Sequence, residues 1–351
     1  MNIKKYTLAL GMAAIALTVA AAEDTSKIDA TLCDKDATAS TKELYRWMRE
    51  EVWGKKVISG AHALWDYNTT EAEKMNRYAL KMPKMNIYDF QHSYAEWCDY
   101  KGTSAADWQK AGGIVGFMWH WHIAKTPFSL QSTAKKNESA RGFYTPGNNG
   151  DYTYFRPMYA TTPGTLEYKV LMKDLEQVKD LLLHYQSQGL TVVWRPFHEA
   201  AGNAANTGSG NGAWFWWGID GPDACKRLWR FVQDYLWENG VHNLIYVWTT
   251  QLNDTKWYPG DKYVDIVARD NYDNDSHGSK LNDWKTIRTL YPNKMAALAE
   301  CGVIPSPENI KKDGTYWLYV APWCSDDYVP GRNDAEFIKT WLNASDVIIS
   351  R

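Results

Sequence analysis

"TVVWRPFHEAAGNAANTGSGNGAWFWWG", residues 191–218, is the stretch from which we interpret the whole chain. The apolar and β-branched run LTVVWRPF, residues 190–197, ends just before Glu199. A loop of small residues follows, and four aromatic residues then occupy positions 214–217. The stretch predicts a buried strand with a carboxylate at its carboxyl end and a large aromatic surface close to that carboxylate in the sequence.

Seven further short apolar runs along the chain resemble residues 190–197. Several of them are almost uninterrupted apolar segments, as expected of parallel strands that are buried on both faces. The seven are KVISGAH (56–62), NIYDF (86–90), GIVGFMWH (113–120), NLIYVWTT (243–250), VDIVARD (264–270), KMAALAE (294–300) and YWLYVAP (316–322).

Helical patterns lie between the predicted strands. In residues 166–189 the spacing of Leu171, Leu175, Val178 and Leu182 predicts a helix with one apolar face, and Gly189 supplies a stop. Residues 223–240 end in the same way. Eight strands that alternate with helices predict an α/β fold, a single (β/α)8 TIM barrel with parallel strands. The alternative, an open doubly wound sheet, would need a glycine-rich phosphate loop after its first strand, and SGAHALWD does not resemble one.

The first residues, MNIKKYTLALGMAAIALTVAAAED, predict a secretory signal peptide over residues 1–22, with the barrel domain over residues 23–351. The apolar run is short for a membrane anchor. We therefore expect an exported protein without a membrane span, periplasmic or extracellular, and a monomer. Without residues 1–22 the chain has 37 basic and 41 acidic residues, a net charge of −4, so the sequence offers no electrostatic footprint for nucleic acid.

Two features of the composition narrow the function further. Five cysteines permit at most two disulfides, and their scattered spacing is unlike that of a zinc site. The chain also has 19 tryptophans and 22 tyrosines, an excess that is typical of proteins that bind flat, weakly polar ligands such as sugars.

Catalytic residues of such barrels lie at the carboxyl ends of the strands. Glu199 and Glu300 each follow a buried run, on the fourth and the seventh predicted strand. Two facing carboxylates are what glycoside hydrolysis requires, one to protonate the leaving oxygen and one to attack or to activate water. The two-residue period of a strand also places Arg195 on the same side as Glu199, where its positive charge would keep a carboxylate ionised.

The motif WRPFHE…WFWWG, with ALAECG downstream, resembles glycoside hydrolase family 26, the β-mannanases, within a clan of retaining (β/α)8 glycosidases. The resemblance implies that Glu199 is the acid/base and Glu300 the nucleophile, about 5–5.5 Å apart. It also implies substrate-binding roles for seven residues: Trp119, His120, Arg195, His198, Trp214, Tyr272 and Trp323. Of the four residues 214–217, about half are expected to be in the core.

The resemblance implies a β-1,4-mannan substrate and internal cleavage, without a cofactor. Release of mannobiose, or hydrolysis of β-1,3-xylan or of mixed-linkage β-glucan, remains an alternative within the family. The chain departs from the family pattern in the long loop AAGNAANTGSGNGA (200–213), in Cys301 after the nucleophile and in Arg269 before the end of the sixth strand.

Two readings compete with a metal-free glycosidase. The motif HWH at 120–122 places two imidazoles on one face of a strand, as a zinc hydrolase would, but further ligands are missing from strands five and eight. Calcium at the acidic loop DNYDND is a second metal alternative. A non-catalytic sugar-binding barrel is the other class, and such a protein would be expected to have lost one of the two carboxylates.

Overall fold

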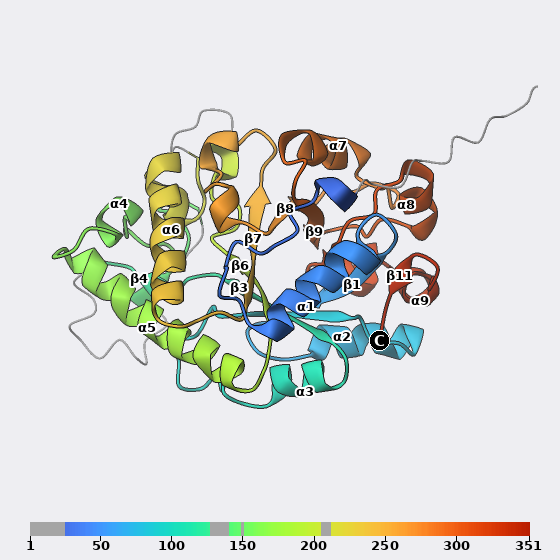
Figure 1. The fold of residues 1–351 in the computed structure, drawn as a ribbon, viewed down its shortest axis with the longest axis horizontal. Helices are drawn as coiled ribbons and strands as arrows, with labels where there is room; N and C mark the ends of the chain where they lie inside the picture. The colour runs from blue at the N-terminus through green and yellow to red at the C-terminus, as the bar shows by residue number, and fades with distance from the viewer. Residues whose placement is uncertain (1–24, 127–139, 149–150, 205–211) are drawn as a thin grey trace, which may run out of the picture.

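The computed structural model describes residues 25–126, 140–148, 151–204 and 212–351 (Figure 1). Within them, eight parallel strands form a sheet whose first and last members also pair, so that the sheet closes into a barrel. The predicted signal peptide lies outside the described residues. In order around the barrel the strands are β1 (Val57–His62), β2 (Met85–Asp89), β3 (Ile114–Trp119), β6 (Val192–Pro196), β7 (Leu244–Thr250), β8 (Ile266–Asn271), β9 (Met295–Cys301) and β10 (Tyr319–Pro322).

The barrel closes at a seam between β1 and β10, where Ile58 is opposite Tyr319. A side chain at Gly60 would bring its Cβ to 2.9 Å from the Cβ of Ala321 in β10, so the seam requires a glycine at that position. Each strand lies within three residues of the boundaries predicted from the sequence. The (β/α)8 barrel prediction is confirmed.

Helices surround the strands and bury their outward-facing side chains (Figure 1). The α-helices are α1 (Ala39–Trp47), α2 (Thr70–Ala79), α3 (Ser104–Lys110), α4 (Pro157–Ala160), α5 (Leu166–Ser187), α6 (Pro222–Glu238), α7 (Leu281–Leu290), α8 (Pro307–Asp313) and α9 (Ala335–Asn343). The shorter 3₁₀ or π turns are η1 (Thr25–Lys27), η2 (Met48–Val52), η5 (Gly202–Ala204), η6 (Trp216–Gly218), η7 (Thr255–Trp257), η8 (Asp261–Tyr263) and η9 (Asp327–Arg332). A small antiparallel ribbon joins β4 (Ile123–Ala124) to β5 (Arg141–Gly142).

Helix α5 shows how the sequence specifies one of these elements. Thr165 caps its first turn by accepting a hydrogen bond from the backbone N–H of Tyr168, and Gly189 follows its end with φ +73°. The four apolar residues of the predicted face are all fully buried: Leu171, Leu175, Val178 and Leu182. Each such burial contributes about 1.5–3 kcal/mol and a cap about 1 kcal/mol, so burial of this face, rather than capping, supplies most of the stability of the helix.

The chain ends at the amino-terminal end of the barrel. The short strand β11 (Ile348–Ile349) pairs with β1 in parallel, and Ile348 lies opposite Val57, the first residue of β1. The backbone of Arg351 exchanges two hydrogen bonds of 2.7 Å with Met82, which precedes β2. The carboxyl terminus is therefore attached to the end of the barrel opposite to the carboxyl ends of its strands.

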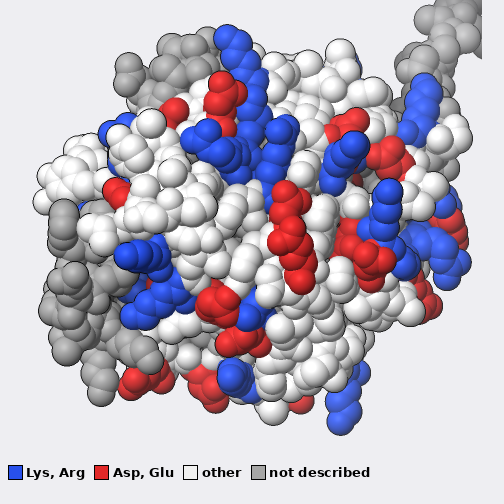
Figure 2. All heavy atoms as spheres, turned by 60° about the vertical axis from the view of Figure 1, so that its left-hand side comes forward, with Lys and Arg blue, Asp and Glu red and all other residues white. Residues whose placement is uncertain are grey.

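The distribution of charged side chains, the length of the helices and the state of the cysteines can be compared with the expectations from composition. Acidic and basic side chains are interspersed on the face shown in Figure 2, and the formal net charge of the full chain is only −2. Among the described residues, no helix is long and apolar enough to cross a bilayer. All five cysteines are free thiols in the structure, so none of the disulfides that their number would permit is formed.

Candidate active site

Glu199 and Glu300 both lie at the carboxyl-terminal end of the barrel. Glu300 is the last residue but one of β9 and is 4% exposed. Glu199 is partly exposed and follows the end of β6 by three residues, in a turn where both Phe197 and Glu199 have φ of +50°. Positive φ is costly for residues with large side chains, about 1–3 kcal/mol each, and such strain is found where a turn must aim a functional group.

Three side chains surround the carboxylate of Glu300. Arg195 donates a hydrogen bond to Oε1, and the hydroxyl of Tyr272 donates one to Oε2 over 2.6 Å. His198 Nε2 lies 3.9 Å from Oε1. Burial alone would raise the pKa of Glu300, but the positive charge of Arg195, assisted by Tyr272, lowers it below the usual value. Glu300 is therefore ionised at neutral pH.

Arg195 joins Glu300 to a second buried carboxylate. Its guanidinium also donates to Asp270 over 3.0 Å and to the Thr249 hydroxyl over 3.1 Å. Burial, opposed by Arg195 and reinforced by Glu300, raises the pKa of Asp270 to about 7. The single guanidinium of Arg195 thus faces two carboxyl groups. The net negative charge that remains raises the pKa of other carboxyl groups nearby.

The pKa of Glu199 is shifted in the opposite direction from that of Glu300. Burial is the main cause that raises its pKa well above the usual value, and the negative charges of Asp270 and Glu300 add to the effect. The Nε1–H of Trp214 donates to Oε2 of Glu199 over 3.0 Å and opposes the rise in pKa. Two carboxyl groups whose pKa values are shifted apart are the signature of an acid and its ionised partner.

Three imidazoles lie beside the carboxyl pair. The backbone N–H of His120 donates to Asp89 over 3.0 Å, and its Nδ1 lies 2.6 Å from the other oxygen of that carboxylate. The ring of His120 meets that of His198 edge-on, with centroids 4.4 Å apart. Burial lowers the pKa of His198 well below the usual value and that of His62 to about 4, so both are neutral at pH 7. Their Nδ1 atoms are buried and have no hydrogen-bond partner among the residues that the structure describes.

Of the predicted substrate-binding aromatic residues, three lie beside the carboxyl pair and its imidazoles. Trp214 and Tyr272 are bonded to the carboxyl groups as described. The half-buried ring of Trp323 lies 5.0 Å from His62 and 5.9 Å from His120. The structure therefore brings Trp214, Tyr272 and Trp323 together with His120, His198, Arg195 and the two glutamates.

Trp119 is placed elsewhere. It is 1% exposed and stacks on Trp121 at 3.7 Å, outside the barrel wall. The reason is the two-residue period of β3, because Met118, whose Sδ lies 3.9 Å from Arg195 Nη2, points inward and its neighbour must point outward. Trp119 is a core residue in this structure and presents no surface to a substrate in the cleft.

The aromatic run at 214–217 is also more buried than expected. Phe215, Trp216 and Trp217 are all buried, which is three of the four rather than about half. Phe215 packs beneath the site, since its buried ring lies 5.2 Å from that of His198. A Cβ at Gly218 would be 1.9 Å from the carbonyl oxygen of Ala200, so the glycine that ends WFWWG lets this segment pass against the turn that carries Glu199.

Asp89, His62 and Asp270 were not among the site residues predicted from the sequence. Their position at the ends of three predicted strands was the available signal, but their partners belong to other strands and could not be inferred. The structure also explains Arg269, which points outward from β8 and bonds to Asp283 of α7 and to Gln251. Cys301 is fully buried as a thiol. Of the loop 200–213, residues 205–211 lie outside the described residues.

The contacts of the HWH motif and of the acidic loop bear on the zinc and calcium hypotheses. His120 of the HWH motif is bonded to Asp89, and His122 packs against the rings of His92 and Phe143. In the part of the chain that the structure describes, no group of three or more His, Cys, Asp or Glu side chains is placed to hold a metal ion, and this includes the acidic loop at 270–275.

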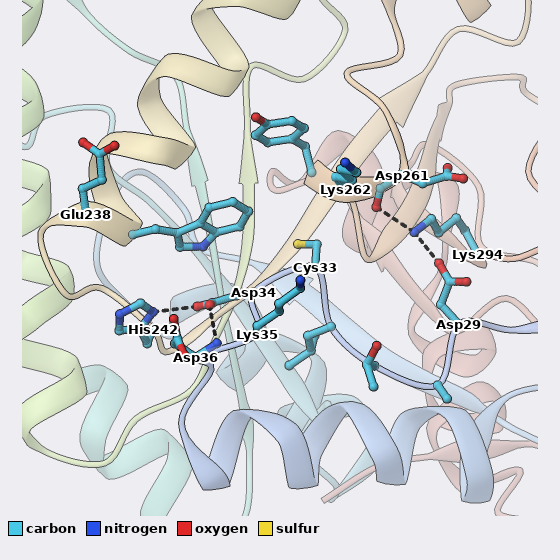
Figure 3. A pocket seen from close by; sticks show the side chains of 15 residues that line it. Asp29, Cys33, Asp34, Lys35, Asp36, Glu238, His242, Asp261, Lys262 and Lys294 are labelled. Carbon is cyan, nitrogen blue, oxygen red and sulfur yellow. Dashed lines mark hydrogen bonds and ion pairs between the residues drawn. The ribbon is translucent and has the colours of Figure 1, made fainter.

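A separate cavity of about 720 Å³ lies at the other end of the barrel (Figure 3). His242 and Lys294, which line it, stand just before β7 and β9. His242 pairs with Asp34 over 2.9 Å and Lys294 with Asp29 over 2.6 Å. These groups are bonded to one another, and we assign the cavity no part in the chemistry of the carboxyl pair.

Comparison with known proteins gives a family for this chain. The model of glycosyl hydrolase family 26 matches residues 33–350. A mannan endo-1,4-β-mannosidase of Thermothelomyces thermophilus is 31% identical, over 96% of this chain and 66% of the relative. Mannan endo-1,4-β-mannosidase A of a Piromyces species is 28% identical, over 88% of this chain and 48% of the relative. The chain thus spans between about half and two thirds of the length of these curated relatives.

Solved structures give the same result. The family 26 domain of an endo-β-mannanase/endo-β-glucanase from Prevotella bryantii is 35% identical, with a TM-score of 0.82 over 92% of this chain and 98% of that one. A β-mannanase from a symbiotic protist of the termite Reticulitermes speratus, complexed with a gluco-manno-oligosaccharide, is 27% identical, with a TM-score of 0.78 over 92% and 97%. On its sequence, its barrel and the family match over almost its whole length, the chain belongs to glycosyl hydrolase family 26.

Proposed function

We propose that this protein is a retaining glycoside hydrolase that cleaves internal β-1,4-mannosidic linkages in mannan, galactomannan or glucomannan. One observation carries the proposal: at the carboxyl-terminal end of one barrel, the surroundings of Glu199 raise its pKa and those of Glu300 lower its pKa. Membership of family 26 and the names of the relatives support the choice of mannan.

The mechanism follows from these protonation states. Ionised Glu300 attacks the anomeric carbon while protonated Glu199 gives its proton to the departing glycosidic oxygen, which leaves a glycosyl–enzyme ester. Glu199, now ionised, takes a proton from a water molecule that attacks the same carbon and releases Glu300. Two inversions retain the configuration. This route requires the carboxyl groups to be about 5–5.5 Å apart when substrate is bound.

The neighbouring residues have distinct tasks in this scheme. Arg195 and Tyr272 hold one oxygen each of Glu300 and keep it anionic and aimed. Trp214 fixes Glu199 through its indole N–H. The half-buried Trp323 contacts the sugar at the cleavage point in this proposal, where an indole ring offers an apolar face to the C–H groups of a pyranose. The buried, neutral His198 orients the carboxylate of Glu300.

The first experiment is a product analysis over time on galactomannan, glucomannan, xylan and lichenan. Mixed oligosaccharides at early times from the first two substrates are expected. Exclusive release of mannobiose, or faster cleavage of xylan or lichenan, would favour the alternative specificities. The anomeric configuration of the first product, read by proton NMR, tests retention, and Glu300→Ala is the matched inactive control.

Export and assembly are further parts of the proposal. The charged and apolar pattern of residues 1–22 supports cleavage after Ala22 and a periplasmic or extracellular location. Amino-terminal sequencing of the protein from its natural host tests this, and sedimentation tests the expected monomer. Hydrolysis by wild-type protein, lost in Glu300→Ala with retained oligosaccharide binding, would exclude a non-catalytic binding barrel.

A further inference from the structure

Two tryptophans on the loops that follow β1 and β2 are the most unusual exposed side chains of the barrel. We propose that Trp65 and Trp97 form an outlying sugar-binding platform, which holds pyranose units of the polysaccharide beyond the catalytic cleft. The proposal rests on the function proposed above, because it takes the ligand to be a β-linked hexose chain that passes between Glu199 and Glu300.

Exposure separates these two residues from the other tryptophans. Of 19 tryptophans, all within the described residues, only Trp65, at 65%, and Trp97, at 60%, belong to the exposed large hydrophobic residues. Burying such a side chain would stabilise the fold by about 1.5–3 kcal/mol, so two exposed indoles forgo that stabilisation. Both lie on loops at the carboxyl-terminal end of the barrel, the end that carries the two glutamates.

The backbone conformation and the hydrogen bonds of the two loops hold these indoles in place. Trp65 and Asp66 both have φ of +59°, a conformation that bulky residues rarely adopt. Asp66 is buried, and its carboxylate lies 2.8 and 2.9 Å from His92 Nδ1 and accepts a hydrogen bond from the Tyr100 hydroxyl. The carbonyl of Asp66 accepts from the backbone N–H of Asp89 over 2.8 Å. One buried aspartate therefore ties the loop of Trp65 to the loop of Trp97.

Trp97 is connected to the catalytic pair by an unbroken series of side chains. Its ring lies 4.9 Å from that of His92. From there the series of neighbouring rings continues inward through His122 (5.2 Å), Phe143 (4.4 Å), His120 (5.1 Å) and His198 (4.4 Å), and His198 Nε2 is 3.9 Å from Glu300. A series of largely buried rings thus connects Glu300 with the exposed indole.

The strand order indicates where a polymer must leave the cleft. Glu199 follows β6 and Glu300 ends β9, and between them lie β7 and β8 on one side and β10, β1, β2 and β3 on the other. A linear chain that passes between the two carboxyl groups leaves across the middle of each arc. On the longer arc this middle is formed by β1 and β2, whose loops carry Trp65 and Trp97. Indole faces there match the C–H faces of pyranose rings.

The test compares a long and a short substrate in the full-length protein. Trp65→Ala, Trp97→Ala and the double variant are measured on galactomannan and on an aryl β-mannobioside, which is too short to leave the cleft. The double variant is expected to raise KM for galactomannan about 5- to 20-fold, since tenfold corresponds to about 1.4 kcal/mol. Its kcat and its turnover of the aryl substrate should remain within twofold of wild type, and Trp97→Tyr should restore most of the affinity.

The control is Leu290→Ala, which removes another exposed apolar side chain, at the end of α7 just before β9 and thus at the other end of the barrel. This variant should leave kcat and KM unchanged on both substrates. An unchanged galactomannan KM in the double variant overturns the platform, as does an equal loss on both substrates. If the two indoles instead mediate self-association, sedimentation of the double variant changes while KM does not. Failure of the proposed function appears separately, as absence of turnover of either substrate by the wild type.

Discussion

The indole Nε1 of Trp214 lies 3.0 Å from Oε2 of Glu199. This bond stabilises the ionised form of Glu199, so Trp214→Phe should raise the pKa of Glu199 further and move the alkaline limb of the kcat/KM profile to higher pH. Loss of positioning should also lower kcat/KM about fivefold, the value of one hydrogen bond of about 1 kcal/mol to a neutral group. An alkaline limb that stays in place would contradict the assignment of Glu199 as the acid.

The wild-type enzyme should show a bell-shaped pH profile. Its acidic limb reports protonation of Glu300, below the usual carboxyl pKa, and its alkaline limb reports ionisation of Glu199, above it. Asp270→Asn removes a negative charge that raises the pKa of Glu199, so it should move the alkaline limb to lower pH. Kinetics of an aryl mannoside over a pH series measure both limbs, and an unmoved limb would show that Asp270 has no electrostatic influence on the acid.

Tyr272→Phe removes the 2.6 Å hydrogen bond to Oε2 of Glu300. A bond to a charged acceptor is worth about 1.5–3 kcal/mol, so kcat/KM should fall about 10- to 100-fold. The acidic limb of the profile should move upward, because the ionised nucleophile loses a donor. Unchanged thermal stability serves as the control that the fold is intact. A pure increase in KM with an unmoved acidic limb would instead give Tyr272 a role in substrate binding alone.

Glu199→Gln should stabilise the folded protein at neutral pH while it inactivates the enzyme. The pKa of Glu199 is higher in the folded state than in the unfolded chain, so the wild type loses stability as pH rises from the unfolded value through the folded one. Glutamine cannot ionise and escapes that loss. Denaturant unfolding should show an advantage of the variant at pH 7 that disappears below about pH 4. An advantage independent of pH would indicate a packing effect.

Arg195→Ala should destabilise the protein strongly, by about 3–5 kcal/mol, because it leaves Glu300 and Asp270 buried without their shared cation. Urea unfolding measures this loss. The double variant with Asp270→Asn is the informative comparison, since removal of one of the two stranded charges should recover part of the stability. If it recovers none, the cost lies in the cavity left by the guanidinium rather than in electrostatics.

The barrel and its two glutamates could be predicted because their signals are local. A buried run followed by a carboxylate marks both Glu199 and Glu300, and the alternation of strand side chains correctly placed Arg195 inside. The same alternation, applied to Met118 and Trp119, would have placed Trp119 outside, but its role was inferred from resemblance alone. The bond between Asp66 and His92 joins two loops that are separate in the sequence, and no local pattern contains it.

The attachment of β11 beside the start of β1 has a practical consequence. Because Arg351 is fixed at the amino-terminal end of the barrel, a protein module fused behind it would emerge on the far side of the molecule from Glu199 and Glu300. A reporter or an anchoring domain could be joined there without covering the end of the barrel that carries the two glutamates. Immobilisation through Arg351 would turn that end toward the surrounding solution.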